Sequence, residues 1–530
     1  MSLRYEFDYL CSDAISHNAQ VFANSIAVVC GEERLTWREL DIRTNQVANA
    51  ILALGFDKGD KIALFMPNSL ALFELFWGVV KAGCVVVCLN TMLEGSALAR
   101  ITNSSDARAM FAGGSARTLV DEVRDTLEGI APEHFYSVDS PGEGWTSAQT
   151  LFGAAPSTPP QVTLLPSDSM TIIYSSGTTG VPKGIEHTHF GRLNYPHGFA
   201  MGLAINRYSV AICATPIYAS GTWITMFPTM YRGGTVVLLP QYSPEAFIDA
   251  VQRERGTHSF LVPTQYIGLL QQPLQNYDLG SLKALVTAGQ SLLPATYAAL
   301  LRAFPHAGIY EVYGMTEGFS TLAIPEDVAR GKIGSVGKPS FLDDVRIIDE
   351  QGRELPPGET GEIVAYGPGM MKGYYNRPDM TEAATWISPA GRTYMRSGDL
   401  GQLDEDGFLY VNGRLKDMIK SGGINIYAAD LEQIVIEHPA VHEVAVIGVP
   451  HEKWSETPVA VVLLKPGASA EPEALMRWAN ERLSKYQRLS KVLIRDELPR
   501  AIYGKVQKQV LREQVLVLLG SGTSEKVKRQ

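Results

Sequence analysis

Short apolar runs alternate along the chain with stretches whose apolar residues recur at helical spacing. Residues 61–66 and 85–89 are predicted to be buried strands, and residues 69–82 between them an amphipathic helix. Strand, helix and strand over such distances are typical of a parallel sheet. Further buried strands are predicted at residues 211–215, 233–239, 259–263 and 284–287. The pattern therefore predicts an α/β fold.

A hairpin and a capped helix are predicted ahead of these strands. Residues 27–30 form a β-prone run that a polar turn joins to a second strand. Thr36 then precedes a helical pattern, with Glu39 three residues later, which is the arrangement of a capping box. Residues 119–130 are predicted to be helical, and residues 137–166, rich in Ser, Pro, Gly and Thr, to form a surface connector.

The pattern changes at residue 417 to that of a compact α+β segment. Its helices are predicted at residues 428–438 and 474–482, and its strands at residues 441–449, 457–464 and 491–494. Because 530 residues exceed what one hydrophobic core usually supports, at least two domains are expected. The predicted fold class is α/β, with a large multi-sheet N-terminal domain and a small α+β C-terminal domain.

Composition narrows the class of protein. With 45% hydrophobic and 19% charged residues the chain resembles an ordinary soluble protein, and its net charge of −10 gives no reason to expect nucleic-acid binding. The longest apolar stretch, residues 72–89, contains Glu74 and Lys81, so no membrane span is predicted. Five cysteines and the absence of a signal-peptide pattern favour the cytoplasm. Cys84 and Cys88 lie in a predicted strand without the further ligands that a metal site needs.

Residues 171–184 indicate a chemical function more specifically than any other stretch. Their sequence is Thr-Ile-Ile-Tyr-Ser-Ser-Gly-Thr-Thr-Gly-Val-Pro-Lys-Gly. The apolar start predicts a short strand, and the glycines after it allow successive backbone N–H groups to converge on an anion. No Ser or Thr follows Lys183, so this is not a Walker A loop. A flexible surface turn is the alternative. The residues predicted to bind phosphate are Ser175, Ser176, Gly177, Thr178, Thr179, Gly180 and Lys183.

This loop resembles the signature of the adenylate-forming superfamily, which includes acyl-CoA synthetases, stand-alone adenylation domains and beetle luciferases. Residues 313–317, Tyr-Gly-Met-Thr-Glu, resemble a second motif of that family. The resemblance implies that Tyr313 stacks on adenine, that Thr316 contacts the α-phosphate, and that Glu317 holds Mg²⁺. A hard ion that bridges phosphates normally takes one or two protein carboxylates. The other residues that the resemblance places at the ATP site here are Ala288, Gly289, Gln290 and Gly314.

Further matches follow in family order. The resemblance implies that Asp399 binds the ribose hydroxyls, that Arg414 reaches the ribose and α-phosphate, and that Lys505 is the catalytic lysine of adenylation. Tyr503 departs from the threonine that is common before this lysine. Lys416 is the implied hinge of a mobile lid. The expected division is residues 1–412 for the adenylation domain, 413–416 for the hinge and 417–530 for the lid.

The segment around Pro216 bears on the substrate. Many acyl-CoA synthetases have a histidine three residues after this proline, but here that position is Ala219. Residues 215–223 contain no carboxylate to pair an ammonium group, which disfavours an amino-acid substrate. Val312, where relatives of long or planar acids commonly have glycine, indicates a shorter or differently directed pocket. The predicted acyl pocket consists of Tyr218, Ala219, Trp223, Gly289 and Val312.

His187 and His189 lie near the phosphate loop, where a structural role is more common than a catalytic one. Gly422, Gly423 and Trp454 match positions that contact CoA in relatives. We therefore predict an AMP-forming acid–thiol ligase of fatty or aryl acid metabolism. It would use ATP, Mg²⁺ and coenzyme A to convert a carboxylic acid through its acyl-adenylate to acyl-CoA. The alternatives are an adenylation enzyme that loads a carrier protein and a nucleotide-binding regulator without turnover. The acid and the oligomeric state, including a homodimer, stay open.

Overall fold

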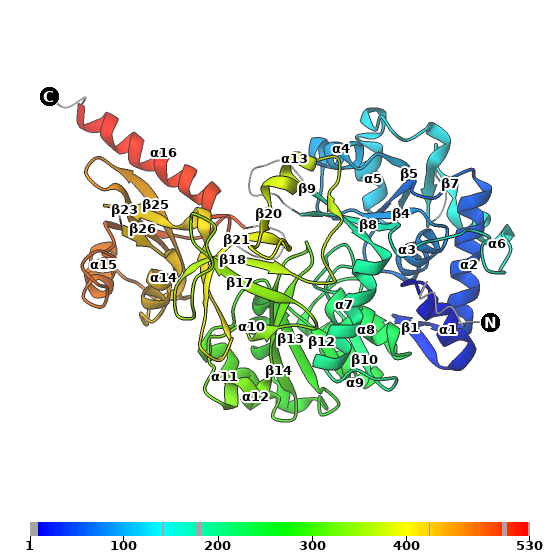
Figure 1. Cartoon of the computed structure of the whole chain (residues 1–530), viewed down its shortest axis with the longest axis horizontal. Coiled ribbons are helices and arrows are strands. Elements are labelled where there is room, and N and C mark those ends of the chain that lie inside the picture. Colours follow the sequence, from blue (N-terminus) through cyan, green and yellow to red (C-terminus); the bar gives the residue numbers. More distant parts are fainter. Residues whose placement is uncertain (1–8, 140–141, 176–182, 423, 501–505, 528–530) are drawn as a thin grey trace. The chain divides into compact units, whose positions relative to one another are not determined.

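The computed structural model describes residues 9–139, 142–175, 183–422, 424–500 and 506–527, without the side chains of residues 175 and 520–527. The chain divides into two compact units (Figure 1). The first runs through Asp344 and takes up the chain again at Tyr366–Thr385, and the second contains Val345–Ala365 and the residues from Trp386 onward. The expected hinge at residues 413–416 lies inside the second unit, and the division at residue 412 stays a prediction.

Two sheets form the frame of the first unit. In spatial order, the described strands of the larger sheet are β16 (Lys338–Pro339), β15 (Ser320–Ala323), β14 (Gly308–Gly314), β13 (Ala284–Ala288), β12 (His258–Phe260), β10 (Val210–Cys213), β11 (Thr235–Leu238), β1 (Ile26–Cys30) and β2 (Glu33–Thr36). Those of the other sheet are β19 (Gly373–Tyr374), β9 (Lys183–Thr188), β8 (Ser169–Ser175), β4 (Val85–Cys88), β3 (Lys61–Phe65), β5 (Ala107–Ala112), β6 (Phe135–Ser137) and β7 (Thr146–Ser147).

The helices of this unit connect and cover the strands. They are α1 (Asp13–Val21), α2 (Trp37–Ala53), α3 (Leu70–Lys81), α4 (Gly95–Ser104), α5 (Ala116–Asp121), α6 (Ala148–Ala154), α7 (His189–Gly202), α8 (Trp223–Tyr231), α9 (Pro244–Glu254), α10 (Pro263–Leu270), α11 (Pro294–Ala303), α12 (Pro325–Ala329) and α13 (Pro378–Ala383), with short 3₁₀ helices η1 (Arg124–Thr126), η2 (Pro132–His134) and η3 (Leu274–Asn276). Strands β3, β4 and β5 pair in parallel, as do β10 to β14, which confirms the predicted parallel α/β arrangement.

The predicted start of the chain is also confirmed. Strands β1 and β2 form an antiparallel hairpin. Thr36 caps α2, because its hydroxyl accepts the Glu39 N–H while the Glu39 carboxylate accepts the Thr36 N–H. No helix among the described residues has both the length and the apolar character needed to cross a bilayer.

Two predictions in this region are wrong. The helix expected at residues 119–130 ends at Asp121, because the later apolar residues Val123 and Leu127 are buried from separate turns around η1 rather than from one continuous helix. The connector expected at residues 137–166 contains β7 and α6. Its Ser and Thr residues include the cap Ser147, whose hydroxyl accepts the Thr150 N–H. Composition alone cannot separate a capping serine from a loop serine.

The second unit also contains two sheets. The described strands of the first are β17 (Asp344–Ile348), β18 (Gly361–Tyr366), β21 (Thr393–Leu403) and β20 (Thr385–Ile387), with β22 (Leu409–Arg414) beside β21. Those of the second are β24 (Ile424–Ile426), β23 (Ile419–Ser421), β26 (Ser455–Leu464) and β25 (Val441–His451), with β27 (Lys491–Arg495) beside β26. The helices are η4 (Leu415–Asp417), α14 (Ala428–Ile436), α15 (Pro472–Asn480) and α16 (Lys508–Val527). The α+β segment predicted from residue 417 is confirmed.

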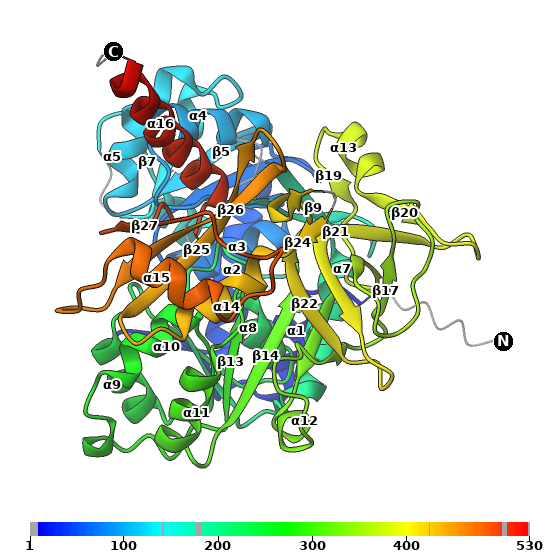
Figure 2. The ribbon, with the colours of Figure 1, turned by 90° about the vertical axis from the view of Figure 1, so that its left-hand side faces the viewer.

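Helices cover both faces of this last sheet (Figure 2). Val446 of β25 packs in a cluster with Leu431 of α14 and Leu475 of α15. Its neighbours Ala445 and Ile447 pack instead in a cluster that includes Leu511 of α16. Successive side chains of a strand point to opposite faces, so one apolar strand supplies two cores.

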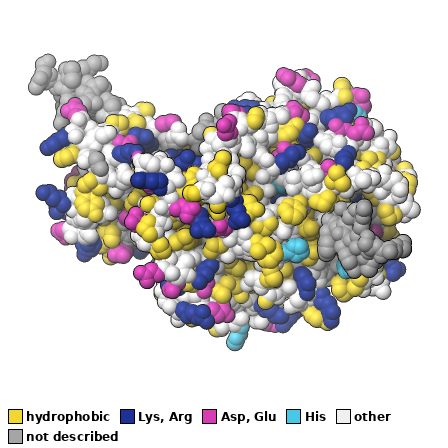
Figure 3. Space-filling model, in the orientation of Figure 1, with side chains coloured by type: hydrophobic (Ala, Val, Ile, Leu, Met, Phe, Trp, Pro, Cys, Tyr) yellow, Lys and Arg dark blue, Asp and Glu magenta, His cyan; other side chains and the backbone are white. Residues whose placement is uncertain are grey.

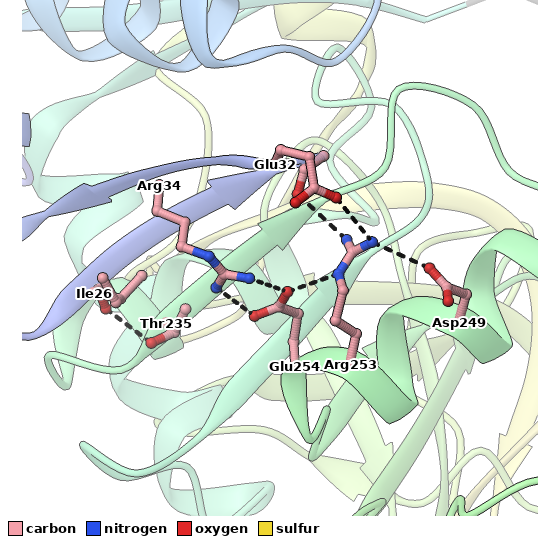
Figure 4. A network of polar contacts seen from close by, with 8 residues as sticks. Ile26, Glu32, Arg34, Thr235, Asp249, Arg253 and Glu254 are labelled. Carbon is pink, nitrogen blue, oxygen red and sulfur yellow. Dashed lines mark hydrogen bonds and ion pairs between the residues drawn. The ribbon is translucent and has the colours of Figure 1, made fainter.

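Charged residues on the surface are largely interspersed. On the face drawn in Figure 3, basic and acidic side chains alternate over short distances. One network joins the β1–β2 hairpin to α9 (Figure 4), where Arg34 donates two hydrogen bonds of 2.7 Å to Glu254. Arg253 Nε lies 2.9 Å from the same carboxylate and its NH1 lies 3.2 Å from Asp249. Both arginines of this network therefore form ion pairs with carboxylates of the protein itself.

Candidate functional site

The predicted phosphate loop connects two antiparallel strands of the first unit. β8 ends at Ser175, β9 begins at Lys183, and these two residues are partners in the ladder. The loop residues Ser176, Gly177, Thr178, Thr179 and Gly180 lie outside the described residues. The Nζ atom of Lys183 lies 5.1 Å from the centre of the Tyr374 ring, a favourable position for a cation.

The second predicted motif lies at the C-terminal end of β14. This strand runs parallel to β13, with Val312 paired to Ala288, and Gly289 follows with a positive φ of 88°. Ligands of α/β sheets collect at such strand ends. Gly314 cannot be replaced there without movement, because a Cβ would lie 2.4 Å from the backbone oxygen of Phe319. Tyr313 lies against Phe319, with 5.9 Å between the ring centres.

Glu317 is a buried carboxylate held by a tyrosine. It is 8% exposed, and its Oε1 accepts a hydrogen bond of 2.8 Å from the Tyr374 hydroxyl. Burial and the nearby Glu317 charge raise the pKa of Tyr374, so the phenol stays protonated and donates at neutral pH. Tyr374 belongs to β19, which pairs with β9. The tyrosine therefore links Glu317 of the motif to Lys183 beside the loop.

Thr316 contacts the segment that follows β10. Its Oγ1 lies 3.0 Å from the Ser220 Oγ, and the Ser220 carbonyl accepts a hydrogen bond of 3.2 Å from the Tyr195 hydroxyl. The predicted acyl residues Ala219 and Trp223 of the same segment are buried, at 5% and 0% exposure. Burial raises the pKa of Tyr218 to about 12, so neither Tyr218 nor Ala219 provides a charge where relatives place histidine.

The two residues predicted to bind ribose and α-phosphate are neighbours in the second unit. Asp399 of β21 pairs with Arg414 of β22 in the ladder, and the Arg414 Nε lies 3.0 Å from the Asp399 Oδ1. Gly398 precedes the aspartate with a φ of 69°, a conformation that favours glycine. The predicted hinge residue Lys416 lies in η4.

Two of the residues predicted to bind CoA are in contact. The Gly422 N–H donates a hydrogen bond of 2.8 Å to the Trp454 carbonyl, and a Cβ on Gly422 would lie 2.9 Å from the indole ring. The Trp454 side chain is 44% exposed, with the Lys453 Nζ 4.6 Å from its ring centre. Gly423 and Lys505, together with Tyr503, lie outside the described residues.

Sequence reasoning missed Tyr374, Ser220, Tyr195 and Arg192. Tyr374 stands in a loop-like stretch, and nothing in its spacing indicates a partner more than fifty residues earlier. A buried tyrosine hydroxyl usually requires a hydrogen-bond partner, but the sequence does not reveal which tyrosines are buried. Arg192 lies within a helix that contains a proline and whose polar and apolar residues do not separate onto two faces. The sequence therefore does not indicate that Arg192 is buried. The structural role favoured for His187 is consistent with its complete burial, which holds its pKa well below 6.5.

The arrangement around Glu317 fits one magnesium ion. The carboxylate is a hard oxygen ligand, and Tyr374 occupies only one of its two oxygens. The described residues contain no cluster of three or more His, Cys, Asp and Glu side chains placed to form an all-protein metal cage. A single carboxylate that shares its ion with phosphate oxygens agrees with both observations.

Comparison with known proteins assigns the chain to a family. Residues 15–375 match the family described as AMP-binding enzyme, and residues 430–505 match the AMP-binding enzyme C-terminal domain. The chain belongs to the AMP-binding enzyme family.

Other AMP-binding enzymes resemble the chain over most of its length. A feruloyl-CoA synthase from Amycolatopsis is 35% identical over 500 residues, which cover 93% of this chain and 96% of the relative. A long-chain-fatty-acid–CoA ligase, FadD13 of Mycobacterium tuberculosis, is 32% identical over 489 residues, or 91% and 93% of the two chains. The ATP-bound structure of MatB from Rhodopseudomonas palustris superposes with a TM-score of 0.84 at 28% identity, covering 94% of this chain and 98% of MatB.

These findings confirm the predicted family, the fold of a large N-terminal and a small C-terminal domain, and the prediction of an AMP-forming acid–thiol ligase. As an AMP-binding enzyme, the chain activates a carboxylic acid as its acyl-adenylate and transfers the acyl group to CoA.

Proposed function

We propose that the cluster of Lys183, Tyr374, Glu317 and Thr316 is the phosphate end of the adenylation site. The observation that supports this most directly is the Tyr374–Glu317 hydrogen bond, because it places a buried carboxylate next to the lysine that ends the phosphate loop. Lys183 would bind the β- and γ-phosphates, and Thr316 the α-phosphate that the acid attacks. Catalysis of this step is mainly the positioning of charge.

Magnesium would bind at one carboxylate of this cluster. Glu317 would hold it through the carboxylate oxygen that Tyr374 leaves open. When bound, the ion supplies positive charge against the phosphate oxygens. Tyr374 keeps the carboxylate oriented, and the 8% exposure of Glu317 limits its contact with water.

The nucleoside and acceptor residues complete the proposal. Asp399 would accept both ribose hydroxyls, with Arg414 as its ion-pair partner. Lys505 would neutralise charge during adenylation, and rotation about Lys416 would withdraw it before transfer. Trp454 and Gly422 would then contact CoA, since the exposed indole offers an apolar surface beside a glycine backbone. We expect Val312, which is 6% exposed, to limit the acyl pocket.

Pyrophosphate release tests the reaction. The purified protein should release pyrophosphate from ATP and Mg²⁺ only with a suitable carboxylic acid, and should form a CoA thioester when CoA is added. Acid-dependent pyrophosphate release without consumption of CoA would identify a carrier protein as the acceptor instead. ATP binding without pyrophosphate release from any acid of a broad panel would contradict enzymatic turnover.

A further inference from the structure

Arg192 is a buried cation that touches three side chains of its own unit. It lies in α7, is 1% exposed, and its NH2 donates a hydrogen bond of 2.9 Å to His187 Nδ1. The Arg192 Cζ lies 4.7 Å from the centre of the Trp223 ring and 5.7 Å from that of the Tyr195 ring. Burial lowers the pKa of Arg192 to about 10, so the guanidinium is charged at neutral pH. Side chains of β9, α7 and α8 therefore meet at this cation.

The imidazole connects Arg192 to the backbone of Thr316. A guanidinium can only donate, so His187 Nδ1 is the acceptor and the proton of the neutral ring lies on Nε2. Burial and the Arg192 charge hold the pKa of His187 well below 6.5, although hydrogen bonding to the backbone of Thr316 and Ile185 favours the protonated ring. The ring therefore stays neutral, with Arg192 on one side and the Thr316 backbone beside it.

A second path leads from Arg192 to the side chain of Thr316. Both aromatic residues beside the guanidinium donate to the Ser220 carbonyl, the Tyr195 hydroxyl at 3.2 Å and the Trp223 backbone N–H at 3.1 Å. The Ser220 hydroxyl in turn lies 3.0 Å from the Thr316 Oγ1. The two paths reach different parts of one residue, its backbone and its hydroxyl. A displacement of Arg192 would therefore change the surroundings of both.

We propose that Arg192 is a positioning residue of the adenylation step, because it fixes the orientation of Thr316. This inference rests on the proposed function, in which Thr316 binds the α-phosphate. The threonine hydroxyl must point at the phosphate when the acid attacks, and rotation about χ1 would turn it away. The Ser220 contact opposes that rotation, and the His187 contact opposes movement of the backbone. A guanidinium suits this role, since it donates in its plane while its faces pack on aromatic rings.

A double-mutant cycle separates this role from a merely structural one. Thr316→Val removes the hydroxyl at nearly constant volume, and Arg192→Met keeps an unbranched stem against Trp223. Pyrophosphate release is measured with a panel of saturated fatty acids, benzoic acid and cinnamic acid, and the kinetics are then determined with the fastest acid. We expect Arg192→Met to lower kcat about 10- to 100-fold in the wild-type protein, but less than about threefold in the Thr316→Val background.

The outcomes of the cycle are distinct. Losses that multiply in the double variant would show that Arg192 acts independently of Thr316, and would overturn the inference while the proposed function stands. An unchanged rate for Thr316→Val would overturn both the assignment of Thr316 and the inference. If no acid of the panel releases pyrophosphate, the proposed function fails and the inference fails with it. The KM of the acid should stay within about twofold in Arg192→Met, because an orientation needed in the transition state affects kcat.

Lys81→Met is the matched control for the loss of a buried cation. Lys81 is 6% exposed, belongs to the same unit and pairs with Asp41 at 2.7 Å. We expect this variant to have a lower melting temperature and an unchanged kcat. An equal loss of kcat in Lys81→Met would attribute the effect of Arg192→Met to destabilisation and overturn the inference.

Tyr195→Phe replaces Arg192→Met in the cycle if the latter does not fold. It keeps the ring against the guanidinium and removes only the hydroxyl that donates to Ser220. We expect it to lower kcat about fivefold in the wild-type protein, the usual effect of one neutral hydrogen bond, and to have no further effect beside Thr316→Val. A fivefold loss that persists in the Thr316→Val background would overturn the inference.

Discussion

Arg34 and Arg192 both belong to the first unit, but the surroundings of their charged groups are opposite. The Arg34 side chain is 40% exposed and forms a two-bonded pair with Glu254 (Figure 4). Arg192 is 1% exposed, and its contacts are a neutral imidazole and two aromatic rings. Glu317 resembles Arg192, because its carboxylate is buried and accepts a hydrogen bond from the uncharged hydroxyl of Tyr374. The exposed charge therefore has a counter-ion within the fold, whereas the two buried charges have uncharged partners among the described residues.

Among the substitutions that test this contrast, Glu317→Gln should have the largest effect on activity. The substitution removes the negative charge that is proposed to bind magnesium and keeps the shape of the side chain. We expect the rate of pyrophosphate release to fall by about 100- to 1000-fold, the usual cost of removing one preorganised electrostatic group. The magnesium concentration at half-maximal rate should rise as well. Glu254→Gln, at a carboxylate that already has arginine partners, should leave both measurements unchanged; an equal loss there would remove the distinction.

Glu311 is another acidic residue of the first unit, and its burial is expected to affect the stability of the fold. Burial raises its pKa from 4.5 to about 7, against hydrogen bonds from Ser291 and Leu292 that favour the charged form. A raised folded pKa means that the neutral carboxyl suits the fold, so its stabilising effect is complete below about pH 4.5 and is lost as the pH rises through about 7. Glu311→Gln should therefore match the wild type near pH 4.5 and be more stable at pH 8, by up to about 3 kcal/mol.

Thermal unfolding at both pH values measures this difference. Glu326→Gln, at an exposed residue of the same unit, is the control and should show no pH-dependent gain. A Glu311→Gln protein that is equally stable or less stable at pH 8 would mean that the hydrogen bonds from Ser291 and Leu292 outweigh the effect of burial.

Tyr374→Phe should have a smaller effect, on the hydrogen bond that orients Glu317. A hydrogen bond to a charged group contributes about 1.5–3 kcal/mol, so we expect adenylation to slow by about tenfold or more. The apparent requirement for magnesium should rise in parallel. Tyr375→Phe is the control, since the Tyr375 hydroxyl donates to the exposed Asp106 instead. Unchanged kinetics for Tyr374→Phe would mean that Glu317 is held without the tyrosine.

Arg34→Met should have the smallest effect. Exposed ion pairs contribute at most about 1 kcal/mol, and Arg253 stays beside Glu254 in the variant. We expect the melting temperature to fall by less than about 2 °C in dilute buffer and to equal the wild type in about 1 M salt. A loss that persists in high salt would show that packing, not charge, holds the hairpin to α9.

The sequence predicted the parts of the fold that depend on local pattern. The parallel strands, the Thr36–Glu39 capping box and the α+β segment from residue 417 follow from spacing and capping residues within short windows. Predictions failed where burial came from separate turns, as at Val123 and Leu127, or where a polar composition concealed a capped helix, as at Ser147. A one-dimensional pattern records which residues are apolar, but not which neighbouring turns bury them together.

Some residues of the candidate site could likewise be predicted from the sequence, and others could not. The residues within the Tyr313–Glu317 motif could be found because they are consecutive and follow a strand. Tyr374 and Arg192 could not be found, because the first is defined by a contact with a residue distant in sequence and the second by its burial without a carboxylate partner among the described residues. Neither property is visible before the chain is folded. The loop from Ser176 to Gly180 and the Lys505 assignment lie outside the described residues and stay predictions.

The path of the chain sets the order in which this site is made. Tyr374 and β19 belong to the first unit but are synthesised after β17 and β18 of the second. Glu317 leaves the ribosome 57 residues before its tyrosine, which at about 5–20 residues per second is an interval of about 3 to 11 s. During that interval the nascent chain already contains the complete Tyr313–Glu317 motif without the hydroxyl that orients its carboxylate. The Glu317–Tyr374 pair of the candidate site therefore forms only after most strands of the first unit have been synthesised.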